Sequence, residues 1–172
     1  MQVIRSELLK YKRTLTKKLI LIIPLFFSIQ AAAGVGLMPK DIVRNWNLVI
    51  SMAFNIWTTV FLPLGMALFA FLVDNQERKA GNYCSLCVHR TSPISIWIGK
   101  ISVMAFHTLL SSIILSVSIF ISGIITATGQ IPLKHIFEAA IVSWLVSLTL
   151  IPIQLFAATW KGLFFSMAIG FI

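Results

Sequence analysis

The chain has 172 residues, of which 58% are hydrophobic and 11% are charged. A water-soluble domain of this size cannot enclose so much apolar surface, so the composition excludes a soluble globular protein. The formal net charge of +9 raises the question of nucleic-acid binding. The 14 basic residues flank apolar runs and form no aromatic-interleaved groove, so we expect no nucleic-acid partner.

Four apolar runs long enough to cross a bilayer follow one another along the chain. Barrel strands are shorter and alternate polar with apolar residues, so these runs predict α-helices. The sequence therefore predicts an all-α polytopic membrane helix bundle, formed by a single transmembrane domain over residues 1–172 and surrounded by the lipid bilayer.

Residues 1–18 predict an amphipathic helix that lies on the membrane surface. Apolar side chains recur there at three- and four-residue spacing and share one helical face: Ile4, Leu8, Tyr11 and Leu15. Six basic residues occupy other positions of the segment: Arg5, Lys10, Lys12, Arg13, Lys17 and Lys18.

The predicted full spans are 19–38, 47–73, 96–127 and 136–159. Pro24 is expected to kink the first of them. Ser112, Ser116 and Gly123 share one face of the third, where small side chains permit close helix packing. A last apolar piece, 163–172, corresponds to about 15 Å of helix, half a bilayer. We therefore expect the chain to end inside a truncated fifth span.

The orientation follows from the basic residues on each side of these spans. Eleven of the 14 lie in the N-terminal segment, in or beside the segment 74–95, or at Lys161. The opposite side has Lys40, Arg44 and Lys134. This asymmetry predicts a cytosolic N-terminus.

Cys84 and Cys87 form a single CxxC pair with His89 nearby. This spacing can begin a zinc site or a redox pair, but no second ligand pair is present. The default interpretation is two free cytosolic thiols and no metal site.

Two polar residues inside the spans are candidates for a translocation path. His107 lies near mid-membrane, where an ionisable group is a functional candidate, although a neutral imidazole bonded to a neighbouring helix is equally consistent. Asn55 in the second span is a weaker candidate of the same kind.

Catalytic motifs are missing from the sequence. Glu138 is read as the only carboxylate close to an apolar run, so no acid and base pair forms within the membrane. The chain has no GxxxxGK[ST] phosphate loop and cannot be its own ATPase. We expect that it is not an enzyme and binds no cofactor.

The segment 74–95 with adjacent Lys100 is the most informative part of the chain. It reads DNQERKAGNYCSLCVHRTSPISIWIGK as far as this lysine, with a charged start, an aromatic and apolar middle and a Ser-Pro break. Two wide spans joined by such a loop, after a basic surface helix, resemble the permease subunits of type-two ABC exporters.

More closely, the chain resembles the lantibiotic self-protection (immunity) permeases of Gram-positive bacteria. Its matching positions are Glu7, Lys10, Lys12 and Arg13, the pair Asn45 and Trp46, and Glu77, Lys79, Gly81, Asn82 and Tyr83, followed by Ser-Pro-Ile-Ser. It departs from the family in Tyr83, where many relatives have Trp, and in length, because such permeases have six spans.

The resemblance implies that 74–95 holds a coupling helix that docks on a separate ABC ATPase, which binds ATP and Mg²⁺. Glu77, Arg78 and Lys79 would make polar contacts with the ATPase, and Tyr83 and Leu86 would pack into its groove. A second permease subunit, identical or different, would complete the transporter in the bacterial cell membrane.

The implied substrate is a cationic, amphipathic antimicrobial peptide that is expelled so that its producer survives. Two alternatives remain open from the residues. One is export of another amphiphile, such as bacitracin, a drug or a lipid, and the other is a non-transporting assembly factor or sensor anchored by its basic N-terminal helix.

Overall fold

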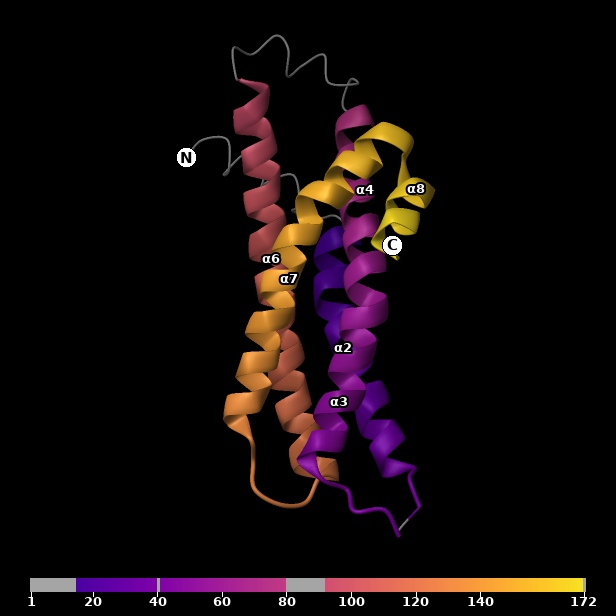
Figure 1. Cartoon of the computed structure of the whole chain (residues 1–172), viewed down its shortest axis with the longest axis vertical. Coiled ribbons are helices and arrows are strands. Elements are labelled where there is room, and N and C mark those ends of the chain that lie inside the picture. The colour runs from indigo at the N-terminus through magenta and orange to yellow at the C-terminus, as the bar shows by residue number, and fades with distance from the viewer. Residues whose placement is uncertain (1–14, 40, 80–91, 172) are drawn as a thin grey trace.

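The computed structural model describes residues 15–39, 41–79 and 92–171. Its elements are all helices and form one elongated bundle (Figure 1). They are α2 (Leu15–Gly36), α3 (Trp46–Ile56), η1 (Trp57–Phe61), α4 (Leu62–Lys79), α6 (Pro93–Thr126), α7 (Leu133–Lys161) and α8 (Leu163–Gly170). The prediction of an all-α helix bundle is confirmed.

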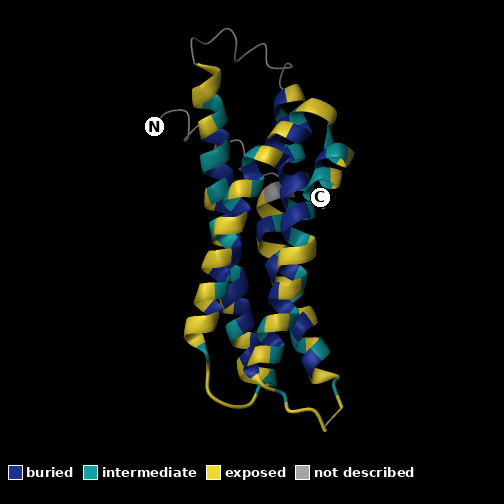
Figure 2. Ribbon diagram, in the orientation of Figure 1, coloured by how far each residue is buried: buried dark blue, intermediate teal, exposed yellow. Residues whose placement is uncertain are grey.

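Four continuous helical stretches are long and apolar enough to cross a membrane: Lys17–Gly36, Trp46–Lys79, Pro93–Thr126 and Leu133–Lys161. Large apolar side chains cover their outer faces, and the exposed residues mark the outside of each helix in Figure 2. Phe26 is 60% exposed and Ile125 is 78% exposed. Such a surface is stable in lipid and not in water, which confirms a multi-pass membrane protein.

The helices pack around a shared apolar core. Helix α2 lies against α6 and α3, while α7 contacts α6, α4 and α8. Val35, Val49, Leu115 and Ile119 are fully buried between these helices. Ser112, Ser116 and Gly123 are buried on α6, as their shared small-residue face predicted.

Gly123 permits the closest of these approaches. A Cβ atom placed on it would collide with the indole ring of Trp46 at the start of α3. Trp46 is itself buried and lies near the ring of Phe120. A residue without a side chain is therefore needed where α3 crosses α6.

The connections gather at two opposite ends of the bundle. The turns after α2 and after α6 lie at the lower end in Figure 1, where Thr128 N donates to Arg44 O over 2.7 Å. The end of α4, the start of α6 and the turn after α7 lie at the upper end. This agrees with the two groups of turns predicted from the sequence.

A π-helical turn interrupts the second span at Trp57–Phe61. Leu62 N donates to Trp57 O across this turn, and Pro63 follows at once. Because proline has no N–H and its ring crowds the preceding turn, the wider π turn accommodates Pro63 without ending the helix.

Two helix boundaries differ from the sequence prediction. Helix α4 continues to Lys79, past Val73. Helix α6 begins at Pro93, because Ser92 caps it by accepting from Ser95 N and proline is favoured in the first turn.

Candidate functional site

A buried ion pair joins two helices at the upper end of the bundle. Lys100 Nζ on α6 donates to Glu77 Oε2 on α4 over 2.5 Å. The Lys100 side chain is 3% exposed and that of Glu77 is 5% exposed. An ion pair this deeply buried is held by close geometry, and removal of either partner leaves the other charged and desolvated.

A second polar contact links the same end of α4 to α7. Arg78 Nε donates to Asp74 Oδ2 over 2.7 Å, one turn earlier in α4, and Asp74 is buried. Arg78 Nη2 donates to Thr159 O over 2.7 Å, in the last turn of α7. An arginine at this position satisfies a helix C-terminal carbonyl and opposes the negative end of the helix dipole.

These contacts correct two sequence predictions. Asp74–Lys79 was placed in a loop but forms the last part of α4. Glu138 was taken as the only carboxylate close to an apolar run, but Asp74 and Glu77 are buried in the helix that completes the second span. Pairing with Arg78 and Lys100 offsets the cost of desolvating these carboxylates. The helix therefore continues through charged residues that the sequence prediction placed in a solvent-exposed loop.

The residues expected to contact an ATPase fall into three groups. Glu77 is buried against Lys100 within the chain, whereas Arg78 and Lys79 are exposed at the end of α4. Tyr83 and Leu86 lie outside the described residues, as do Cys84 and Cys87 and most of the N-terminal segment. Within the described part of the chain, His, Cys, Asp and Glu residues form no group of three or more that could hold a metal ion.

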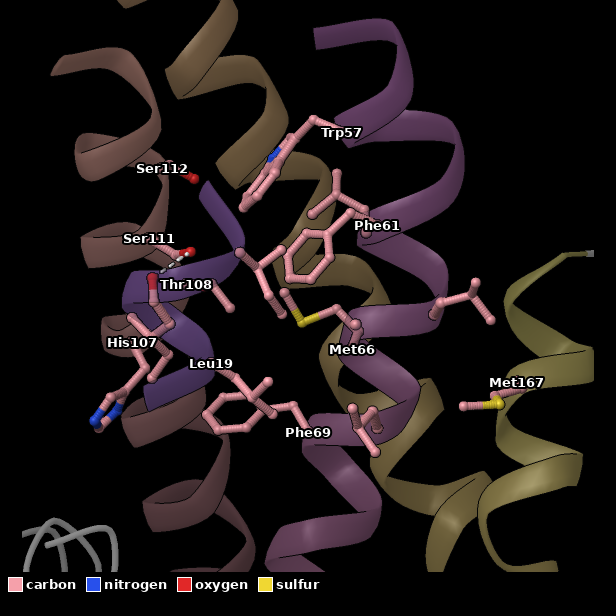
Figure 3. A pocket seen from close by; sticks show the side chains of 16 residues that line it. Leu19, Trp57, Phe61, Met66, Phe69, His107, Thr108, Ser111, Ser112 and Met167 are labelled. Atoms are coloured by element: carbon pink, nitrogen blue, oxygen red, sulfur yellow. Dashed lines mark hydrogen bonds between the residues drawn. The ribbon is translucent and has the colours of Figure 1, made fainter. Parts of the chain in front are cut away.

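A cavity of about 230 Å³ lies between α2, η1, α4 and α6 (Figure 3). Apolar side chains of α2, η1 and α4 form most of its wall, including Ile23, Phe61, Met66 and Phe69. Helix α6 adds a polar strip that consists of His107, Thr108, Ser111 and Ser112. In Figure 3 Ser111 and Ser112 lie across from Trp57 and Phe61, whereas the His107 ring points away from them.

His107 lies on the cavity wall, within the third span. Its Nδ1 lies 2.8 Å from Val103 O on its own helix, so this nitrogen is the donor. The Phe69 and Phe106 rings lie beside it, with centroids 6.1 and 5.8 Å from the imidazole. This bond holds the imidazole against its own helix.

Asn55 does not join His107. It is exposed and does not line the cavity, and its carbonyl accepts from Thr59 Oγ1 at the start of the π turn. The two residues that the sequence linked to a translocation path are thus on different surfaces. Trp57 and Phe61 line the cavity with His107, and their ring centroids lie 4.3 Å apart.

Trp57 and Phe61 were not recognised as site residues in the sequence, where they read as ordinary core residues of an apolar span. The available signal was their position just before Pro63, because a proline inside a span is often accommodated by a π turn that redirects the neighbouring side chains. Gly65 adds to this arrangement, since a Cβ there would lie 2.6 Å from the Phe61 ring.

Comparison with known families identifies the class of this membrane protein. The sequence model of the ABC-2 family transporter proteins matches residues 3–172. The chain belongs to the ABC-2 transporter family. No curated protein and no solved structure matches it.

Membership of the ABC-2 family fixes the general activity. ABC-2 permeases are the membrane subunits of ABC transporters, and a separate ABC ATPase hydrolyses ATP for them. The family subunit transports and is not itself an ATPase, which agrees with the missing phosphate loop. The resemblance to type-two exporters is therefore confirmed at this level.

Proposed function

We propose that this ABC-2 permease exports a lantibiotic-type antimicrobial peptide from the membrane of a Gram-positive producer and so protects the cell from its own product. The matching positions at Asn45, Trp46 and in 77–83 support this substrate class. The eleven-to-three bias of basic residues in the sequence supports a cytosolic N-terminus. A second permease subunit, identical or different, would complete the transporter.

The observation that carries the transport mechanism is the buried pair of Glu77 and Lys100. Helix α4 ends at Lys79 and α6 begins at Pro93, so this pair ties together the two helices on either side of residues 80–91. A force applied to that segment would move α4 and α6 together. The Arg78 bond to Thr159 O extends the same connection to α7.

The ATPase contact is assigned to the segment 74–95. Within it, exposed side chains are assigned to the ATPase and buried side chains to contacts inside the chain. Lys79 and the exposed part of Arg78 would meet the ATPase, and Tyr83 and Leu86 would pack into its groove. Aromatic and arginine anchors dominate such interfaces, and truncation of a central one costs about 2 kcal/mol or more. Glu77 would support the segment from within and not touch the ATPase.

The experiment is co-purification with the ABC ATPase encoded beside this chain, together with resistance of the host to the peptide. The double variant Tyr83→Ala and Leu86→Ala should insert normally, lose the ATPase and lose resistance. The control Ser85→Ala and Thr91→Ala changes the same segment without removing the anchors and should keep both. Unaltered co-purification and resistance in the first variant would reject the coupling role.

Resistance measured against several amphiphiles separates the substrate classes. Protection against a lantibiotic, and not against bacitracin, supports the proposal. Protection against bacitracin alone would assign the transporter to the other amphiphile class.

A further inference from the structure

The wall of the cavity offers little to a charged ligand. Two hydroxyl groups on it are already bonded within the chain, since Thr108 Oγ1 donates to Ala105 O over 2.9 Å and Ser111 Oγ donates to Ile20 O over 3.3 Å. His107 is bonded to its own helix through Nδ1. The described residues that line the cavity include no Asp, Glu, Lys or Arg. A charged group would lose its hydration there without gaining a counter-ion, so the cavity favours an apolar chain.

The cavity has room for part of one hydrocarbon chain. An apolar cavity of about 150 Å³ holds benzene, so a cavity of about 230 Å³ corresponds to roughly nine carbon atoms. Helix α2 packs against α6 and α3 and makes few contacts with α4, although α2 and α4 both line the cavity. The cavity is partly open, so hydrocarbon from the surrounding bilayer can enter it. A chain bound there would fill the space between α2 and α4.

Two lysines stand at one end of this cavity. Leu19 and Ile20 line the cavity, and Lys17 and Lys18 precede them in the first turn of α2. Both lysines are exposed, and the ion pairs found among the described residues include neither of them. At a rise of about 1.5 Å per residue, they lie within about 5 Å of Ile20 along the helix axis. The bond from Ser111 to the Ile20 carbonyl holds this end of α2 beside α6.

The lysines mark the level of one headgroup layer. A lysine inside the hydrocarbon is costly, and its long side chain extends toward the interface instead. From Lys18 to its end at Gly36, α2 rises about 27 Å, close to the hydrocarbon thickness of about 30 Å. The two ends of α2 therefore reach the two headgroup layers. The cavity begins directly below the layer on the lysine side, where the first carbons of a lipid acyl chain lie.

The charge at this end of the cavity selects the occupant. Two adjacent ammonium groups attract an anionic phospholipid and repel a cationic peptide. We propose that Lys17, Lys18 and the cavity form a binding site for one anionic phospholipid, whose phosphate is held by the two lysines and whose acyl chain enters the cavity between α2, η1, α4 and α6. This lipid belongs to the leaflet on the N-terminal side of the bundle and is distinct from a transported peptide.

The test is photolabelling of the full chain in phosphatidylcholine nanodiscs, without the ATPase. The probe is phosphatidylglycerol with a diazirine on one acyl chain, and phosphatidylcholine with the same chain is the neutral counterpart. We expect saturable labelling by the phosphatidylglycerol probe, mapped by mass spectrometry to the cavity-lining residues of α2, α4 and α6. Unlabelled phosphatidylglycerol should displace it. The phosphatidylcholine probe should label mainly the outer faces of the helices.

A pair of double variants tests the headgroup contact. Lys17→Gln with Lys18→Gln should reduce labelling in the cavity about tenfold, because two attractive charges are lost. Lys40→Gln with Lys134→Gln removes the same net charge from the opposite end of the bundle and should leave this labelling unchanged. All four positions carry basic side chains outside the apolar core, so we expect each double variant to fold as the parent chain does.

A pair of single variants tests the space for the acyl chain. Ile23 lines the cavity, and in Ile23→Trp the larger side chain should occupy it and abolish labelling of the α4 and α6 residues. Ile22→Trp is the same change one position earlier, where the side chain is 58% exposed on the outer face of α2. It should leave the labelling in the cavity unchanged.

Several results would overturn the site. Equal labelling of the cavity by both probes, or equal loss in the two lysine double variants, would remove the role of Lys17 and Lys18. Labelling confined to the outer helix faces, or equal loss with Ile23→Trp and Ile22→Trp, would remove the chain from the cavity. Displacement of the probe by the lantibiotic of the resistance assay, but not by unlabelled phosphatidylglycerol, would assign the cavity to the transported peptide.

Discussion

Glu77 near the end of α4 and Lys100 near the start of α6 form a buried ion pair, with Oε2 and Nζ 2.5 Å apart. The sequence prediction placed Glu77 in the cytosolic loop and Lys100 at the start of the third span. Their pairing places a structural connection between α4 and α6, directly beside the segment to which ATPase binding is assigned.

Neutralising one member of this pair should destabilise the protein. Glu77→Gln or Lys100→Met removes one charge of the buried pair and leaves the other buried without its ion-pair partner, a loss of about 3 to 5 kcal/mol. We expect a lower thermal unfolding midpoint for each single variant in detergent. The double variant Glu77→Met and Lys100→Met should recover most of the loss, because neither charge of this pair remains buried.

The exposed pair of Lys134 and Glu138, 3.7 Å apart at the start of α7, provides the control. Lys134→Met should change the midpoint very little, since exposed pairs are worth about 1 kcal/mol or less. If Lys100→Met is as harmless as this control, or if the double variant is as unstable as both singles combined, the ion pair is not a stabilising contact.

The contact between Gly123 and Trp46 predicts a second loss of stability. In Gly123→Ala the new methyl group would overlap the indole ring, so α3 and α6 must separate. Overpacking of this kind costs about 1 to 3 kcal/mol and should lower the thermal unfolding midpoint. Gly36→Ala is the matched control, because a Cβ at this position in α2 meets nothing within 4 Å. Equal midpoints for the two variants would contradict the packing described.

The orientation can be tested with single cysteines in a chain that lacks Cys84 and Cys87. From the eleven-to-three bias of basic residues we expect that Lys40→Cys reacts with an impermeant thiol reagent in intact cells. Ser92→Cys should react only after the membrane is opened. Labelling of Ser92→Cys alone in intact cells would reverse the topology.

The surface helix remains a prediction from sequence, since residues 1–14 lie outside the described part of the chain. A synthetic peptide of residues 1–18 should be a coil in buffer and gain helix on anionic vesicles, seen by circular dichroism. Each basic residue near an anionic surface contributes on the order of 1 kcal/mol. Zwitterionic vesicles are the control, and a coil spectrum on the anionic vesicles would reject the surface helix.

The sequence alone determined the class of the protein, its four long spans and the two groups of connecting turns. These features depend on the length and apolarity of continuous segments, because lipid requires every spanning segment to satisfy its own backbone. The resemblance in 74–95 also correctly indicated an ABC-type permease. It could be read from the sequence because it depends on the order of residues within one short segment.

Only the tertiary structure decided which polar residues meet. Glu77 and Lys100 are separated by the segment 80–91, so neither their pairing nor the extension of α4 to Lys79 follows from local charge. The cavity likewise required four packed elements and the π turn that positions Trp57 and Phe61 beside α6. His107 could be singled out in the sequence because an ionisable residue in a span is rare. Trp57 could not, because in the sequence it resembles any other apolar residue of the span. Only the packed structure shows that its N–H has no acceptor among the described residues.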